Sequence, residues 1–244
     1  MLKEKSKKTD RYISSQLYME TDYYKKPKEL FKQIGRIIAG RISKKKLYSI
    51  LDVGCAKGEF LYYLKKNNMP FLEMVGIDFS KNLIDEARCF EGLQGVNFHC
   101  NLAQSFNQKK QFDFVTIISV LSFFDEPEIV LSNLKKHLKK NGLLYVVGIF
   151  NNYNVDVLIK YRNNKYSNEF ENGMNNYSLE TTAKILGKLN MKISHCYKFN
   201  MPFRLQKQKN PIRSWIMETP EGRKFVTGHG LIYDMYILEI KNIK

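Results

Sequence analysis

Two aspartates and two glycines are the residues whose spacing could do chemistry in this chain. Asp52 ends an apolar run, and Gly54 and Gly58 follow before the apolar positions of a helix begin. A strand that turns through glycines into a helix directs backbone amides at a ligand, because glycine permits both the tight turn and a close approach. Asp78 lies at the end of the next apolar run, where a ribose hydroxyl would need an acceptor. The pattern predicts a ligand that contains a nucleoside.

The residue at position 56 distinguishes a dinucleotide from other ligands that contain a nucleoside. In the dinucleotide-binding loop Gly-x-Gly-x-x-Gly, the second glycine lets the backbone approach a pyrophosphate. This chain has Ala56 at that place, and its methyl group disfavours a nicotinamide dinucleotide.

Strands and helices are expected to alternate around these residues. Apolar runs predict strands at 49–53, 73–79, 96–102, 112–121, 143–150, 191–199 and 231–240. Helical periodicity and caps predict helices at 58–67, 83–90 (N-cap Ser80), 128–140 and 178–190, a short one near Gln104 and one that opens at Pro27. Such an order is typical of a parallel sheet with helices on both faces. Residues 201–230 are expected to be irregular.

The order of these motifs resembles that of the class I S-adenosylmethionine-dependent methyltransferases. It consists of Asp52-x-Gly54-x-x-x-Gly58, Gly76-x-Asp78, and the strand 112–121 followed by Phe124-Asp125-Glu126-Pro127. The resemblance runs from about Ser49 to Ile149. It implies an α/β, Rossmann-like sheet of seven mostly parallel strands whose last strand is antiparallel, with helices on both faces. We expect a basic segment and helical cap at 1–46 and the methyltransferase domain at 47–244.

The resemblance also implies the cofactor and its contacts. The cofactor would be S-adenosyl-L-methionine, the product S-adenosyl-L-homocysteine, and no metal would be needed. Gly54 and Gly58 would make room for the methionine part, with Asp52 near its amino group, and Asp78 would hold the ribose hydroxyls. The whole candidate cofactor set is Asp52, Gly54, Cys55, Ala56, Gly58, Asp78, Phe79, Asn101, Leu102 and Ser119, of which Asn101 and Leu102 would contact the adenine and Ser119 would lie under the methionine chain.

Two positions depart from the family pattern. An aspartate often stands where this chain has Asn101, which weakens the expected adenine contact. A histidine often follows the fourth strand, where this chain has Ser122 and Phe123, and one familiar source of a catalytic base is therefore missing.

His229 is the candidate general base. It lies between Gly228 and Gly230 just before the last strand, on the side of the sheet where ligands bind. The unperturbed pKa of histidine, about 6.5, suits proton removal near neutrality. The competing interpretation is an ordinary loop histidine. His137 is expected at the surface, and His99 and His195 on strands as core or sheet-face residues.

Two long segments, 151–177 and 202–230, are expected to build the acceptor pocket, because the loops that leave strands five and six both begin on the ligand side. Further candidates for acceptor contacts or a lid are Tyr18, Tyr24, Arg204, Arg213 and Trp215. For the tyrosines the alternative is packing within the cap, and for the late-loop residues it is surface scatter.

The composition bounds the remaining possibilities. A chain of 244 residues can form one α/β domain with additions. No segment resembles a membrane span or a signal peptide, so a cytoplasmic protein is expected. The four cysteines show no metal spacing and are expected to be reduced and mostly buried. The net charge of +16, from 40 basic and 24 acidic residues, is compatible with nucleic acid or anionic partners, but also with lysines spread over solvated faces.

These observations favour methyl transfer to an oxygen or nitrogen of a small molecule. By analogy with small bacterial enzymes, a sugar or a surface-polysaccharide precursor is the preferred acceptor. The chain lacks the Asn/Asp-Pro-Pro-Tyr and Pro-Cys motifs of base-methylating enzymes. An RNA methyltransferase that uses the basic surface, and a methyltransferase-like binding protein without turnover, remain alternatives. Neither the acceptor nor the oligomeric state follows from the sequence.

Overall fold

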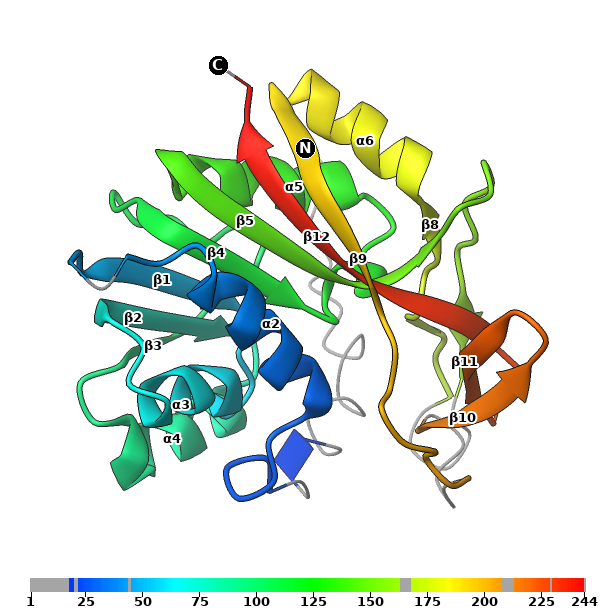
Figure 1. Ribbon diagram of the computed structural model, residues 1–244, viewed down its shortest axis with the longest axis horizontal. Coiled ribbons are helices and arrows are strands. Elements are labelled where there is room, and N and C mark those ends of the chain that lie inside the picture. The colour runs from blue at the N-terminus through cyan, green and yellow to red at the C-terminus, as the bar shows by residue number, and fades with distance from the viewer. Residues whose placement is uncertain are drawn as a thin grey trace.

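One mixed sheet forms the centre of the molecule (Figure 1). The computed structural model describes residues 18–19, 22–43, 45–162, 168–207, 213–228 and 230–243. The sheet has the order β10-β11-β12-β5-β4-β1-β2-β3, with β9 paired to β12 and β8 to β5. Its strands are β1 (Tyr48–Val53), β2 (Phe71–Asp78), β3 (Asn97–Cys100), β4 (Phe112–Ile118), β5 (Leu138–Asn151), β8 (Tyr177–Ser178), β9 (Met191–Phe199), β10 (Ser214–Thr219), β11 (Gly222–Thr227) and β12 (Ile232–Asn242).

The strand directions confirm the predicted fold class. Strands β1 to β5 run parallel to one another, whereas β12 is antiparallel to both β5 and β9. Within the described residues, each of the seven strands expected from the sequence has a counterpart, namely β1 to β5, β9 and β12.

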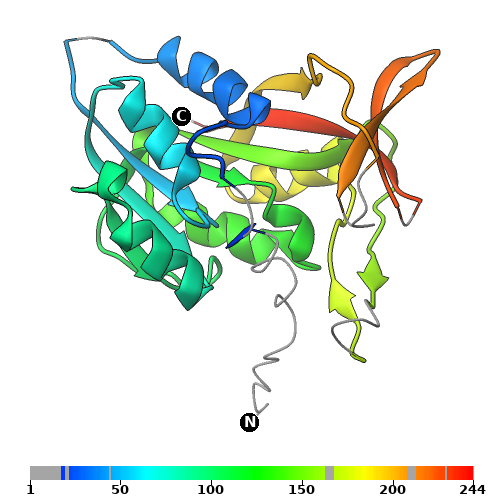
Figure 2. The same ribbon diagram turned by 90° about the horizontal axis from the view of Figure 1, so that it is seen from below.

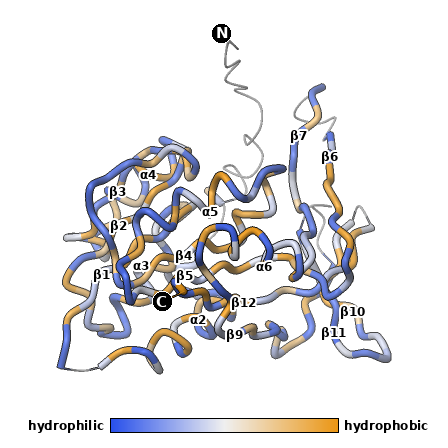
Figure 3. Tube along the Cα trace, turned by 90° about the horizontal axis from the view of Figure 1, so that it is seen from above, coloured by the Kyte–Doolittle hydropathy of each residue, from blue (hydrophilic) through white to orange (hydrophobic). Residues whose placement is uncertain are grey.

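Helices cover both faces of the sheet (Figure 2). They are α2 (Glu29–Ala39), α3 (Glu59–Lys66), α4 (Lys81–Cys89), α5 (Pro127–Lys136) and α6 (Leu179–Lys188). Alternate strand residues face opposite layers: Phe114 packs in one apolar cluster with residues of α2, α3 and α4, and the next residue, Val115, packs in another with residues of α5 and α6. Figure 3 shows the apolar colouring concentrated along these central strands.

Two helix predictions were wrong in part. No helix forms near Gln104, where the chain makes turns. Helix α5 ends at Lys136, four residues before the predicted end, because β5 already begins at Leu138 and pairs there with Phe112. Ser80 occupies the predicted N-cap position of α4, although its side chain makes no capping hydrogen bond.

Two segments form strands that were not expected: the first makes a separate two-stranded sheet, and the second extends the central sheet. Between β5 and α6 the chain forms an arm with the short strands β6 (Lys160–Tyr161) and β7 (Glu171–Asn172), which projects from the body in Figures 2 and 3. Between β9 and β12 it forms the antiparallel hairpin β10–β11. The expectation of an irregular 201–230 was therefore wrong for the described residues 214–227.

Two predictions about single side chains also failed. His137, expected at the surface, is 2% exposed, with its ring nitrogens 3.0 Å and 3.3 Å from the carbonyl oxygens of Phe106 and Lys110. The four cysteines are free, but only Cys55 is buried.

Candidate functional site

The glycine turn lies between β1 and α3, at the carboxyl edge of the parallel strands. Gly54 and Gly58 have φ angles of +73° and +78°, which favour glycine. A Cβ atom on Gly54 would lie 2.3 Å from Cγ2 of Val120, and one on Gly58 would lie 2.7 Å from Cζ of Phe98, so side chains of the protein pack closely against both glycines.

Most amides of this turn are already used within the protein. The amides of Gly54 and Cys55 donate to the carbonyl of Ile77 at 2.8 Å and 2.9 Å, and the Ala56 amide donates to Oδ2 of Asp78 at 3.0 Å. The expectation that the turn presents free amides was therefore wrong for these three residues. A turn with so few unbonded amides is poorly suited to bind a pyrophosphate. This agrees with the sequence prediction that the methyl group of Ala56 disfavours a nicotinamide dinucleotide.

Two buried carboxyl groups flank the turn and fit an ammonium group. Asp52 and Glu59 are each 2% exposed. Burial raises the pKa of Asp52 to about 7, while a 2.6 Å hydrogen bond donated by the Thr116 hydroxyl acts in the opposite direction. Burial also raises the pKa of Glu59, whose Oε1 has no hydrogen-bond partner among the described residues and lies 4.0 Å from Nζ of Lys57. Buried acceptors of this kind are stabilised by a cation that donates hydrogen bonds to them.

Asp78 and the start of the next loop form the second part of the candidate cofactor site. Asp78 accepts hydrogen bonds from the amides of Ala56 and Ser80, one on each oxygen. A carboxylate oxygen can accept more than one hydrogen bond. The Asn101 amide donates to the carbonyl of Asp78 at 2.9 Å, which holds the exposed Asn101 and Leu102 beside it. The predicted ribose and adenine residues are thus neighbours.

A large cavity lies beyond the ends of β4 and β5. Its volume is about 780 Å³, within the range usual for small-molecule sites. Ser119, which follows β4 with a φ of +58°, belongs to its wall and to the candidate cofactor set. The apolar part of the wall comes from the cap, the arm, β5, β9, the hairpin and β12, and includes Leu30, Phe123, Ile149, Tyr161, Met174, Phe199, Met201, Phe203, Leu205, Phe225, Tyr233 and Met235.

Only some of the predicted acceptor residues line this cavity. Tyr18 and Arg213 do, and both long segments contribute wall residues. Tyr24 instead donates a hydrogen bond to the Lys57 carbonyl and stacks on Phe90 at 3.8 Å, so it braces the glycine turn. Arg204 and Trp215 line a separate hollow. His229 lies outside the described residues.

Sequence reasoning missed the charged wall residues of the cap, of which Lys28 is held by aromatic rings. Lys28 directly precedes α2. Its position after Pro27, at the start of the cap helix, could have marked Lys28 as a site residue. Its residue type could not, because the chain has 40 basic residues.

The described residues contain neither a group of metal ligands nor a helix suited to crossing a membrane. Across the described ranges, no three His, Cys, Asp or Glu residues are grouped as metal ligands would be. None of the helices seen there combines the length and apolar character that crossing a bilayer requires.

The central segment of the chain is similar to known methyltransferases. Residues 51–144 match the family model described as methyltransferase domain. The malonyl-[acyl-carrier protein] O-methyltransferases of Bacillus cereus and Haemophilus influenzae are 26% and 31% identical over 108 and 104 residues, which is 44% and 41% of this chain. The matched part spans only 40% and 37% of the length of these relatives.

A similar solved structure covers nearly the whole chain. The S-adenosylmethionine-dependent methyltransferase of Clostridium acetobutylicum superposes with a TM-score of 0.58 over 96% of each chain, at 15% identity. At this identity the similarity concerns the fold. Together, the two comparisons show that residues 51–144 match a methyltransferase domain and that the chain has the fold of class I methyltransferases.

Proposed function

We propose that this protein transfers a methyl group from S-adenosylmethionine to an acceptor that occupies the 780 Å³ cavity. The observation that carries the proposal is Ser119, which belongs to the cavity wall and directly follows β4 at the edge that also holds the glycine turn. A cofactor on the turn and an acceptor in the cavity would then meet at this residue.

The residues fit the methionine end of the cofactor in charge. The buried carboxyl groups of Asp52 and Glu59 would hold the ammonium group. The positive φ angles of Gly54 and Gly58 shape the turn between these two carboxyl groups. Asp78 would hold the ribose hydroxyls. The bound cofactor supplies the activated methyl group. The protein contributes alignment of the acceptor atom and exclusion of water by the apolar wall.

The acceptor is best described as a molecule with an apolar body and a reactive oxygen or nitrogen. The names of the relatives specify oxygen methylation of a malonyl group, which ends in a carboxylate. The expected sugar or polysaccharide precursor receives no support from these relatives, and most of the cavity wall is apolar. We therefore place an amphipathic oxygen acceptor ahead of a sugar.

Cofactor binding by the purified full-length protein tests the proposal. Calorimetry should show binding of S-adenosylhomocysteine and little binding of NAD. Asp78→Ala should weaken the first by at least about 1 kcal/mol, the scale of a hydrogen bond to a charged group. The matched control is Asp85→Ala, an exposed carboxylate on α4 that pairs with Lys81. Preferential binding of NAD, or unchanged affinity in a folded Asp78→Ala variant, would refute the cofactor assignment.

The same preparation separates the two alternative functions. A methyltransferase-like binding protein would bind S-adenosylhomocysteine but methylate nothing in a broad acceptor panel. An RNA methyltransferase would bind RNA with an affinity that falls steeply as salt rises, since each neutralised phosphate releases counterions.

A further inference from the structure

Lys28 is a cation on the cavity wall that is held by aromatic rings. Its Nζ atom lies 4.5 Å from the ring centroid of Tyr23, 4.9 Å from that of Tyr18 and 5.2 Å from that of Phe31. Ring faces attract an ammonium group, but they accept none of its hydrogen bonds in the way a carboxylate does.

No carboxylate within the described part of the chain lies within 4 Å of the Lys28 ammonium group. Of the other cap lysines that line the cavity, Lys26 is exposed and two are paired with carboxylates. Lys25 pairs with Asp22 at 3.3 Å, and Lys32 with Glu29 at 2.5 Å. Burial lowers the pKa of Lys28, while the more distant charges of Glu59 and Asp52 raise it and that of Arg213 lowers it. A half-buried ammonium group therefore faces the cavity with its strongest possible partner missing.

The surrounding wall determines what kind of partner fits. The cavity is lined mainly by aromatic and aliphatic side chains. Its charged lining residues are five cations and one carboxylate, namely Lys25, Lys26, Lys28, Lys32, Arg213 and Glu29. Nη1 of Arg213 lies 3.5 Å from the Tyr23 hydroxyl. A ligand that satisfies this wall has an apolar body and an anionic end.

We propose that Lys28 is the group that binds the anionic end of the acceptor, and that the acceptor is an amphipathic anion such as a carboxylate with an apolar chain. The proposal rests on the function proposed above and adds the charge and shape of the substrate. The Tyr18, Tyr23 and Phe31 rings position the ammonium group, and the apolar wall binds the chain.

The same lysine could instead bind a carboxylate that belongs to the cofactor. Glu59 and Asp52 act electrostatically on Lys28, so the methionine end of the cofactor is not remote from it. The experiment must therefore measure both ligands on the same variants.

Calorimetric titration of the full-length protein with decanoate, decanol and S-adenosylhomocysteine tests the proposal. Wild type should bind decanoate more tightly than decanol. Lys28→Gln should weaken decanoate binding about tenfold or more, the loss expected for a hydrogen bond to a charged group, and should leave decanol and S-adenosylhomocysteine within about twofold. Lys28→Arg, which retains the charge, should keep most of the decanoate preference.

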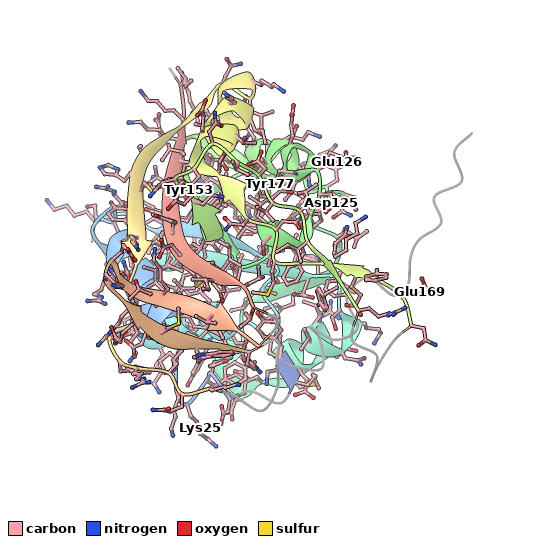
Figure 4. The ribbon with its side chains drawn as sticks, turned by 90° about the vertical axis from the view of Figure 1, so that its right-hand side faces the viewer. Lys25, Asp125, Glu126, Tyr153, Glu169 and Tyr177 are labelled. Carbon is pink, nitrogen blue, oxygen red and sulfur yellow. The ribbon has the colours of Figure 1, made fainter. Side chains whose placement is uncertain are left out.

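Lys25→Gln is the matched control. Lys25 also lines the cavity rim, but its side chain is 86% exposed and paired to Asp22, and it lies at the edge of the molecule in Figure 4. Lys25→Gln removes the same charge as Lys28→Gln. Equal losses of decanoate affinity in the two variants would therefore show a general charge effect and overturn the proposal.

Three other outcomes would also decide the matter. Equal binding of decanoate and decanol by wild type would overturn the proposal. A tenfold loss of S-adenosylhomocysteine affinity in Lys28→Gln with unchanged decanoate binding would assign Lys28 to the cofactor and overturn it too. If S-adenosylhomocysteine does not bind at all but the decanoate pattern holds, the proposed function fails while the anion site stands.

Discussion

The two ends of the ligand-binding edge are built in different ways. Around β1 and β2 the candidate cofactor residues lie on short turns, and their backbone groups are fixed by bonds to the neighbouring strand, as with the Gly54 and Cys55 amides on Ile77. Beyond β4 and β5 the cavity is assembled from the cap, the arm and the hairpin β10–β11, which are far apart in the sequence.

This difference indicates which part of the site tolerates changes of sequence and which part does not. A site on short turns tolerates few changes, because each residue is held by a strand of the sheet. Connecting segments that run over the surface vary more easily and carry specificity. We infer that the β1–β2 side determines which cofactor binds, and that the cap, arm and hairpin determine the acceptor.

Shortening the arm should give the largest effect and is the sharpest test of this separation. Residues 160–172, which include both β6 and β7, can be replaced by a short Gly-Ser linker. Asn175 would remain as the anchor of the base, since its side chain bonds the Ile159 amide and the Phe124 carbonyl. Methyl transfer to the acceptors used by wild type should fall by more than about 100-fold, whereas S-adenosylhomocysteine affinity should stay within about threefold. Loss of cofactor binding in a variant with a normal thermal transition would contradict the separation.

His229→Ala should give the next largest effect if the acceptor is a hydroxyl. General-base catalysis contributes roughly 100-fold to 10,000-fold, and the variant should lose a factor in that range while keeping its cofactor affinity. An ionised carboxylate needs no base, so with such an acceptor the loss should be small. His99→Ala, on the exposed side of β3, is the control. Full activity of His229→Ala on a hydroxyl acceptor would remove His229 from the mechanism.

The cofactor side could be predicted from the sequence because its signals are local. Strand, glycine turn, helix and the following Asp78 are each encoded within a few residues, and the structure has them in the expected places. What the sequence did not show is which amides remain open, since that depends on the carbonyl of Ile77 in another strand.

The acceptor side was harder to predict because its residues are selected by tertiary packing. Trp215 was chosen as an acceptor residue, yet on β10 it alternates with the buried Ile216 and belongs to a different hollow. That alternation could not be used while the segment was expected to be irregular. His137 was misplaced for a similar reason, because its two carbonyl contacts come from a segment without regular structure.

Gly54→Ala should cost stability as well as cofactor affinity. The φ of +73° alone costs a non-glycine residue about 1–2 kcal/mol, and the contact with Val120 adds about 1–3 kcal/mol of overpacking. Gly95→Ala is a close control, because Gly95 has a φ of +84° but nothing within 4 Å of the added Cβ. Urea unfolding should show the larger loss in Gly54→Ala. Equal losses would mean that the turn is not constrained by its neighbours.

The smallest expected effect is the pH dependence of cofactor affinity, which tests whether Asp52 and Glu59 hold the ammonium group. The pKa of Asp52 is raised from 3.8 to about 7, so ionising it opposes folding, and its contribution to stability is full below about pH 4 and lost as pH rises to about 7. A bound ammonium group favours the ionised form and offsets this loss.

S-adenosylhomocysteine should therefore bind more tightly, and raise the melting temperature more, at pH 8 than at pH 6, by up to about tenfold in affinity per pH unit below 7. Asp52→Asn should bind more weakly at pH 8 and lose most of the dependence. The raised pKa of Glu59 acts in the same direction, so Asp52→Asn with Glu59→Gln should remove what remains. Calorimetry in two buffers of different ionisation enthalpy would detect the released proton directly. An affinity that is constant from pH 6 to pH 8 would show that neither carboxyl group contacts the ammonium group of the cofactor. Asp78 would then be the one carboxylate of the candidate site still assigned to the cofactor.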